Sequence, residues 1–208
     1  MEEACDTIPS GLSKNRIETL TDGIFAIAMT LLVLGVIVPH QSPPPTIIEF
    51  LIKSVPELIE YAIGFLALAV IWVLHHQQFH YIRFIDRPIL WLNILALLFV
   101  GLMPFSTSLA DVYAENRLAE IIIGLNLLTI GIIFYLQWVH AARNRCLMSP
   151  DITDRVVRSE RRRNLVIPGI ALVGTMLALF GFGPGIIVYF LIPVIFAIFP
   201  RLDHKIPH

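Results

Sequence analysis

The sequence predicts an all-α integral membrane protein with six transmembrane helices. Of its 208 residues, 56% are hydrophobic and only 15% are charged, and the mean hydropathy is +0.76. A soluble domain carries roughly 25% charged residues, so this composition excludes most soluble folds. Stretches without Asp, Glu, Lys or Arg recur along the chain, and each can hold a helix of about 20 residues, the length that crosses a bilayer. These stretches are 23–48, 61–82, 88–110, 121–142 and 164–200.

Proline and glycine set the expected helix ends. Pro39 and the prolines at 43–45 lack amide donors, so the first helix should end before them. The last apolar stretch is too long for one span, and the Gly- and Pro-rich turn signal at 181–185 divides it. The whole chain, 1–208, is therefore expected to form a single six-helix transmembrane domain. Its helices are expected at 16–38, 54–80, 88–110, 116–143, 161–182 and 184–200.

The distribution of basic residues tests this helix count, because cytoplasmic loops hold the excess of Lys and Arg. With both termini inside, 13 of the 15 basic residues fall in cytoplasmic segments, and only Lys53 and Arg117 fall outside. The external loops are acidic instead. This asymmetry predicts an even number of spans with both termini in the cytoplasm.

Net charge and histidine spacing bear on partners and metals. A net charge of −1 argues against nucleic acid as a partner, because such proteins normally carry a basic excess. His76 and His80 have the i, i+4 spacing that lets two imidazoles bind one metal, which leaves a membrane-bound metalloenzyme as one alternative. The remaining histidines are scattered singly, so we expect no metal, no cofactor and no catalytic residue. One imidazole of this cluster should instead make a buried hydrogen bond to a neighbouring helix.

Polar residues at membrane depth are candidates for function because each is costly to bury. The first helix carries Arg16 and Asp22, followed by apolar residues with Thr30 among them. At about 100° per residue, Asp22 points well away from the apolar stripe and Thr30 lies at its margin. Periodicity alone favours a stripe that packs against neighbouring helices or lipid. The stripe consists of Ile27, Leu31, Leu34 and Val38.

The third helix holds two further signals. Asn93 can donate a hydrogen bond across helices at membrane depth, which is worth about 1 kcal/mol. Pro104 frees a backbone carbonyl, and the hydroxyls that follow it can satisfy that group, so we expect a kink near the external end. Helices four to six have no charged residue in their central turns, which argues against a proton relay there.

These residues resemble a known family. Arg16-x-x-x-Leu20-Thr21-Asp22 resembles the R-x-x-x-F-S-D signature of the transmembrane protein 175 potassium channel family. Leu20 replaces the aromatic residue of that signature, whereas Thr21 keeps its hydroxyl. The six-helix count, the orientation and the length are also similar to prokaryotic members. Further similar motifs in the second and third helices are Trp72-x-x-His75-x-x-x-Phe79, Leu92-Asn93 and Pro104-Phe105-x-Thr107.

The resemblance implies a potassium-selective channel of the prokaryotic cell membrane, not an enzyme. Four copies of the chain would form a homotetramer in the lipid bilayer, with the first helices around a central pore for potassium ions. Ile27, Leu31 and Leu34 would form its apolar constriction, and Thr30 would support ion selectivity. A structural hydrogen-bond network would hold the pore helix. Its members would be Arg16, Thr21, Asp22, Trp72, His75 and Asn93.

A transporter stays the alternative in another functional class. A small secondary or proton-coupled carrier could use Asp22 and His75 as its titrating pair. The lack of charged residues in the later helices speaks against this alternative.

Overall fold

The computed structural model describes residues 13–35, 46–113, 116–182 and 186–198. Within these ranges the chain is helical, and the only β pairing is an isolated bridge between Ile82 and Met148. Five helical segments among the described residues are long and apolar enough to cross a membrane. The predicted class, an all-α integral membrane protein, is therefore confirmed.

Breaks and caps divide several of these segments into shorter helices. The five spans are α1 (Lys14–Leu31) with the 3₁₀ turn η1 (Leu32–Gly35), α2 (Ile47–Tyr81), α3 (Arg87–Gly101) with α4 (Met103–Val112), α5 (Arg117–Arg143), and α6 (Asp154–Arg163) with α7 (Val166–Phe180). A second 3₁₀ turn, η2 (Arg145–Leu147), links α5 to α6.

The predicted sixth helix coincides with two short helices, α8 (Ile186–Tyr189) and α9 (Leu191–Ile198). The predicted ends of the first helix at 38 and of the sixth at 200 lie outside the described residues.

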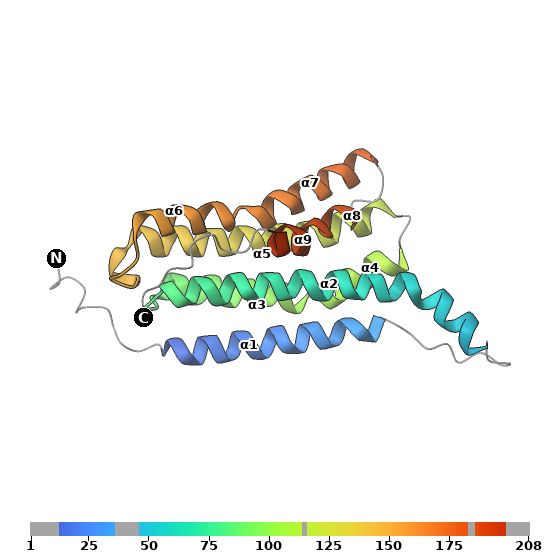
Figure 1. The fold of residues 1–208 in the computed structure, drawn as a ribbon, viewed down its shortest axis with the longest axis horizontal. Helices are drawn as coiled ribbons and strands as arrows, with labels where there is room; N and C mark the ends of the chain where they lie inside the picture. Colours follow the sequence, from blue (N-terminus) through green and yellow to red (C-terminus); the bar gives the residue numbers. More distant parts are fainter. Residues whose placement is uncertain (1–12, 36–45, 114–115, 183–185, 199–208) are drawn as a thin grey trace.

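Helix α2 begins at Ile47, well before the expected start at 54. Thr46 provides the reason, because its hydroxyl accepts from the Glu49 amide while the Glu49 carboxylate accepts from the Thr46 amide. This capping box satisfies two backbone donors that a helix start otherwise leaves unpaired. Pro56 lies inside the helix, and the first turns of α2 bend away from the rest (Figure 1). A proline ring that displaces the preceding turn accounts for such a bend.

The expected break in the third span is present at Leu102, between α3 and α4, and Pro104 occupies the first turn of α4. The following hydroxyls act differently from the prediction. Ser106 and Thr107 donate to the carbonyls of Leu102 and Met103, four residues back in each case. They therefore satisfy their own helix rather than the carbonyl that Pro104 leaves free.

The spans lie side by side as a bundle (Figure 1). Helix α5 is central, because it packs against α3, α4 and α7, whereas α1 packs chiefly on α2 and α3. Helix α1 is thus an edge helix with one face on the bundle. The end at which α1 begins and α2 ends is called the basic end below, and the opposite end is called the acidic end.

Close packing of α5, α7 and α8 depends on glycine. A Cβ atom at Gly124 would lie 2.3 Å from Thr175 Oγ1 and 2.3 Å from the Tyr189 hydroxyl, and one at Gly174 would lie 2.5 Å from the Tyr189 ring. The Tyr189 side chain is buried between these two helices. Small residues at such positions allow helix backbones in membranes to approach closely.

Candidate functional site

Helix α1 has two contrasting faces. The inward face buries Thr21, Phe25 and Ala28 against the bundle. The outward face carries the apolar stripe of Ile27, Leu31 and Leu34, whose exposed fractions are 60%, 43% and 68%. Within a single chain, these three side chains are therefore exposed and are not part of the buried core.

The 3₁₀ turn η1 keeps the stripe straight at the acidic end. Side chains three residues apart eclipse one another in a 3₁₀ helix, so Leu34 stays in line with Leu31. Thr30 is exposed beside the stripe, and its hydroxyl donates to the Ile27 carbonyl over 2.9 Å. Val38, the last residue of the stripe in the sequence, lies outside the described residues.

Behind the stripe, a buried hydrogen-bond chain joins the first three spans. Asn93 Nδ2 donates to Thr21 Oγ1 over 3.0 Å, and His75 Nε2 lies 2.8 Å from Asn93 Oδ1. The Asn93 carbonyl oxygen can only accept, so His75 is the donor in the second bond. All three side chains are at most 2% exposed. The His75 ring also stacks on Phe79, with ring centroids 4.1 Å apart.

A second contact joins α1 to α2 and is separate from this hydrogen-bond chain. Trp72 Nε1 donates to Asp22 Oδ1 over 2.8 Å at a more exposed position. The Arg16 side chain is exposed and makes no hydrogen bond or ion pair with any residue that the structure describes, although its backbone amide donates to the Ser13 carbonyl over 3.1 Å. Of the six network residues selected from the sequence, five thus form three hydrogen bonds in two separate groups, and the Arg16 side chain belongs to neither group.

The histidines at the end of α2 are divided between a buried and an exposed face of the helix. His75 makes its buried hydrogen bond, whereas His76 and His80 are exposed on the opposite face. Among the described residues, no group of three or more His, Cys, Asp or Glu side chains is placed to hold a metal ion.

Two buried side-chain amides make hydrogen bonds that were not predicted from the sequence. Gln78 Nε2 donates to Asn164 Oδ1 over 2.7 Å and to the Phe134 carbonyl over 3.1 Å, which ties α2 to α5 and to the C-terminal cap of α6. Asn126 Nδ2 donates to Ser106 Oγ over 3.0 Å and ties α5 to α4. The sequence did carry a signal for the burial of Gln78. It lies three residues after His75, and residues three apart share one helix face.

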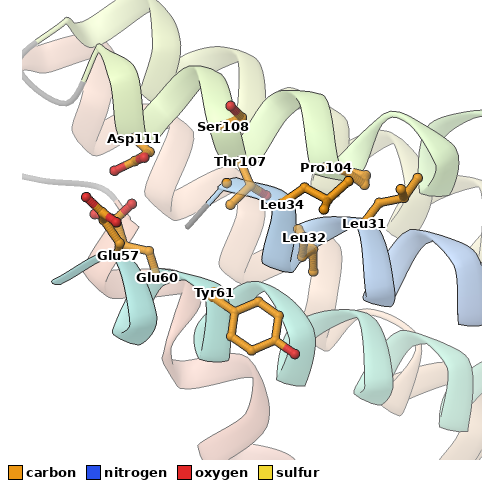
Figure 2. A pocket seen from close by; sticks show the side chains of 11 residues that line it. Leu31, Leu32, Leu34, Glu57, Glu60, Tyr61, Pro104, Thr107, Ser108 and Asp111 are labelled. Carbon is orange, nitrogen blue, oxygen red and sulfur yellow. The ribbon is translucent and has the colours of Figure 1, made fainter. Parts of the chain in front are cut away.

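A pocket of about 310 Å³ lies at the acidic end, between α1, η1, α2 and α4. Figure 2 shows Leu31 and Leu34 at one side of this pocket and the carboxylates of Glu57, Glu60 and Asp111 at the other. The Asp111 side chain points toward the two glutamates from the facing helix. The described residues that line the pocket include no Lys or Arg.

The three carboxylates are close enough to influence one another. Glu60 interacts electrostatically with both Asp111 and Glu57. One carboxylate oxygen each of Glu57 and Glu60 is buried without a hydrogen-bond partner among the described residues. A concave site lined by one sign of charge and apolar walls concentrates ions of the opposite charge. The pocket can therefore attract cations at the end of the exposed stripe.

Comparisons with known proteins agree on one family. A family model for the endosomal/lysosomal potassium channel TMEM175 matches residues 16–104. A potassium channel of Streptomyces collinus is 33% identical over 152 residues, which cover 71% of this chain and 74% of the relative. The human endosomal/lysosomal proton channel TMEM175 is 28% identical over 142 residues, but the match covers only 28% of that longer protein.

Solved structures include a similar fold. The crystal structure of a lysosomal potassium-selective channel TMEM175 homologue from Chamaesiphon minutus superposes with a TM-score of 0.77. Its sequence is 30% identical, and the match covers 89% of this chain and 96% of that one. The similarity thus extends over the later helices, where the sequence motifs give no signal.

Proposed function

This chain belongs to the TMEM175 channel family, and on that premise we propose that it is a potassium-selective channel that conducts passively. Family membership makes it a multi-pass membrane channel and not an enzyme.

The pore is proposed to run along the outward face of α1. The observation that carries this proposal is the exposure of Ile27, Leu31 and Leu34 on an edge helix whose other face is fully packed. Apolar rings of this kind narrow an ion path and can gate it by excluding water. Thr30 would place a hydroxyl next to the rings, where it supports the selectivity for potassium.

The pore requires more than one chain, because one helix cannot enclose an ion path. Most soluble oligomers with closed symmetry place the same surface of each subunit around one axis, and the same geometry would serve here. We propose a homotetramer with four copies of α1 at the centre. The contacts of Thr21 with Asn93 and of Asp22 with Trp72 would then hold each α1 in place without touching the ion.

The charge distribution supports the orientation. Among the described residues of the basic end and the loops beside it, 11 are Lys or Arg, against Lys53 and Arg117 at the acidic end. Because cytoplasmic segments hold the basic excess, the basic end and both termini are proposed to lie in the cytoplasm of a prokaryotic cell. The acidic pocket would then attract potassium at the external mouth.

A flux assay tests the function. Purified protein in liposomes with a potassium gradient and no second ion gradient should bring the membrane to the potassium Nernst potential. An obligate proton-coupled carrier, such as one using Asp22 and His75, would not reach that potential. Repeating the measurement with sodium, and with a proton gradient alone, separates potassium selectivity from the proton conduction named for the human relative.

Native mass spectrometry in mild detergent tests the assembly. The expected species is four times the 23.4 kDa chain mass. A preparation that conducts in liposomes but contains only monomers would contradict a pore shared between chains.

A further inference from the structure

We propose that the groove between α2 and α9 binds an anionic phospholipid of the inner leaflet, with one acyl chain in the groove and its phosphate at Arg163. The proposal rests on the shape of the groove, the charge beside it and its depth in the membrane. It depends on the membrane location of the family and on the proposed cytoplasmic orientation of the basic end, and not on the proposed potassium selectivity.

The groove has the chemistry of an acyl-chain site. It encloses about 480 Å³ on the side of the bundle where α9 packs against α2 (Figure 1). Among the described residues that line it, every one except Arg163 is apolar. Leu66 and Val73, seven residues apart on α2, lie along its length, so it extends about 10 Å along that helix. The hydrocarbon half of a bilayer is about 15 Å thick, so the groove can hold much of one acyl chain.

Arg163 supplies the headgroup contact. Its side chain is 19% exposed, its guanidinium carbon lies 5.2 Å from the Phe196 ring, and its Nη1 is 3.8 Å from a Glu160 oxygen. A guanidinium carries five donors in a planar fork, so it can contact a carboxylate and a phosphate together. The contact with Phe196, a residue of the groove wall, orients the cation at the edge of the groove.

The helix that ends at Arg163 adds positive charge around it. Helix α6 has five arginines against Asp154 and Glu160, which gives 5 − 2 = +3 within ten residues. Four of the arginines are exposed, and Arg161 is held over Tyr135 of α5 by a hydrogen bond of 3.1 Å. Basic clusters at the cytoplasmic side of membrane helices recognise anionic headgroups. This charge is the reason to propose an anionic lipid rather than a zwitterionic one.

The depth of Arg163 agrees with the position of a phosphate. Its neighbour Asn164 accepts a hydrogen bond from Gln78, and α2 ends only three residues later at Tyr81. Arg163 thus lies at the basic end, at the level where the second span leaves the membrane. The apolar groove continues from there toward Leu66, in the direction of the bilayer centre.

Lipid retention by the purified full-length protein tests the proposal. Delipidated protein is mixed with dioleoylphosphatidylglycerol or dioleoylphosphatidylcholine, and bound lipid is measured by native mass spectrometry, with the melting temperature as a second readout. We expect the anionic lipid to bind and to raise the melting temperature. The zwitterionic lipid should bind more weakly, because its phosphate can still reach Arg163 but its choline cation is repelled by the arginines of α6.

Two variants separate the headgroup from the acyl chain. Arg163→Gln should weaken phosphatidylglycerol binding about tenfold, whereas Arg83→Gln, which removes the same charge from the basic end outside the groove, should not. Ala197→Phe fills the groove at an exposed position and should also reduce binding, and Ala69→Phe fills it from α2 if the first variant is poorly folded.

Three results would overturn the proposal. One is equal binding of the two lipids, and another is normal phosphatidylglycerol binding by folded Ala197→Phe or Ala69→Phe protein. The third is a groove-filling variant that changes the oligomeric state without changing lipid binding, because the groove would then be an interface between copies of the chain.

Discussion

The side-chain amide of Asn93 donates a 3.0 Å hydrogen bond to the hydroxyl of Thr21, in the middle of a buried contact between α3 and α1. Its carbonyl oxygen accepts from His75 of α2, so one amide joins three helices. This arrangement fixes the rotation of α1 about its own axis, because Thr21 must face inward to reach Asn93. With Thr21 inward, Ile27, six residues later and about 120° around the helix, is held outward.

Replacing Thr21 should therefore loosen the pore helix. Thr21→Val keeps the shape but removes the acceptor, and we expect a loss of about 1 kcal/mol, the size of a hydrogen bond between membrane helices. For a chain of this length that corresponds to a melting temperature lower by roughly 2–4 °C. Thr21→Ser retains the hydroxyl and should melt like the parent protein. Equal melting temperatures for all three proteins would remove the structural role of this contact.

The apolar stripe should respond to a polar substitution at Ile27. Four asparagines in place of four isoleucines would hydrate the narrowest ring, so Ile27→Asn should raise the conductance and weaken the preference for potassium over sodium. Single-channel recording in bilayers with potassium on one side and sodium on the other measures both quantities.

Met29 provides the matched control for Ile27. It lies on the same helix about 160° away and packs against the core, so Met29→Asn should chiefly lower stability. A stable, tetrameric Ile27→Asn protein with unaltered conductance and selectivity would contradict the proposed pore.

The acidic pocket should increase cation entry at low salt. We expect neutralisation of Glu57, Glu60 and Asp111 to Gln, Gln and Asn to lower potassium conductance by roughly 2- to 10-fold at low ionic strength. In about 1 M salt the Debye length is only about 3 Å, so the difference should nearly vanish. Asp151→Asn, at an exposed site beyond the basic end, is the control and should leave the conductance unchanged. A deficit that persists in high salt would indicate structural damage instead of electrostatic attraction.

The glycine contact between α5 and α7 should tolerate no side chain. Gly124→Ala places a Cβ against Thr175 and Tyr189, and we expect a loss of about 1–3 kcal/mol from overpacking. The Thr175 hydroxyl cannot easily move aside, because it donates to the Ala171 carbonyl over 2.7 Å.

Gly169 is the matched control for this substitution. It lies within α7, and a Cβ there would meet nothing within 4 Å. Gly169→Ala should therefore stabilise the helix by about 0.5–1 kcal/mol. Thermal unfolding in detergent compares the two variants, and a Gly124→Ala protein as stable as Gly169→Ala would refute the tight packing.

Sequence alone determined the membrane class and much of the span order, because hydropathy and basic residues report on each segment independently of its neighbours. It also selected the stripe on α1, since the angle between residues of one helix follows from their spacing. The start of α2 was predicted too late in the sequence. The prediction used only the apolar stretches, and these do not detect the capping box of Thr46 and Glu49. The family motifs extend only to the third span, so the prediction of the later helices rested on their length and hydropathy alone.

Contacts between helices were decided only by the tertiary structure. Which partner Asn93, Asp22 or Gln78 meets depends on the rotation and height of each helix in the bundle, and neither is encoded by a local pattern. The same reason separates Arg16 from the network and brings Glu57, Glu60 and Asp111 into one pocket from two spans. Local periodicity fixes the faces of a helix, whereas packing of small and large side chains between helices fixes which faces meet.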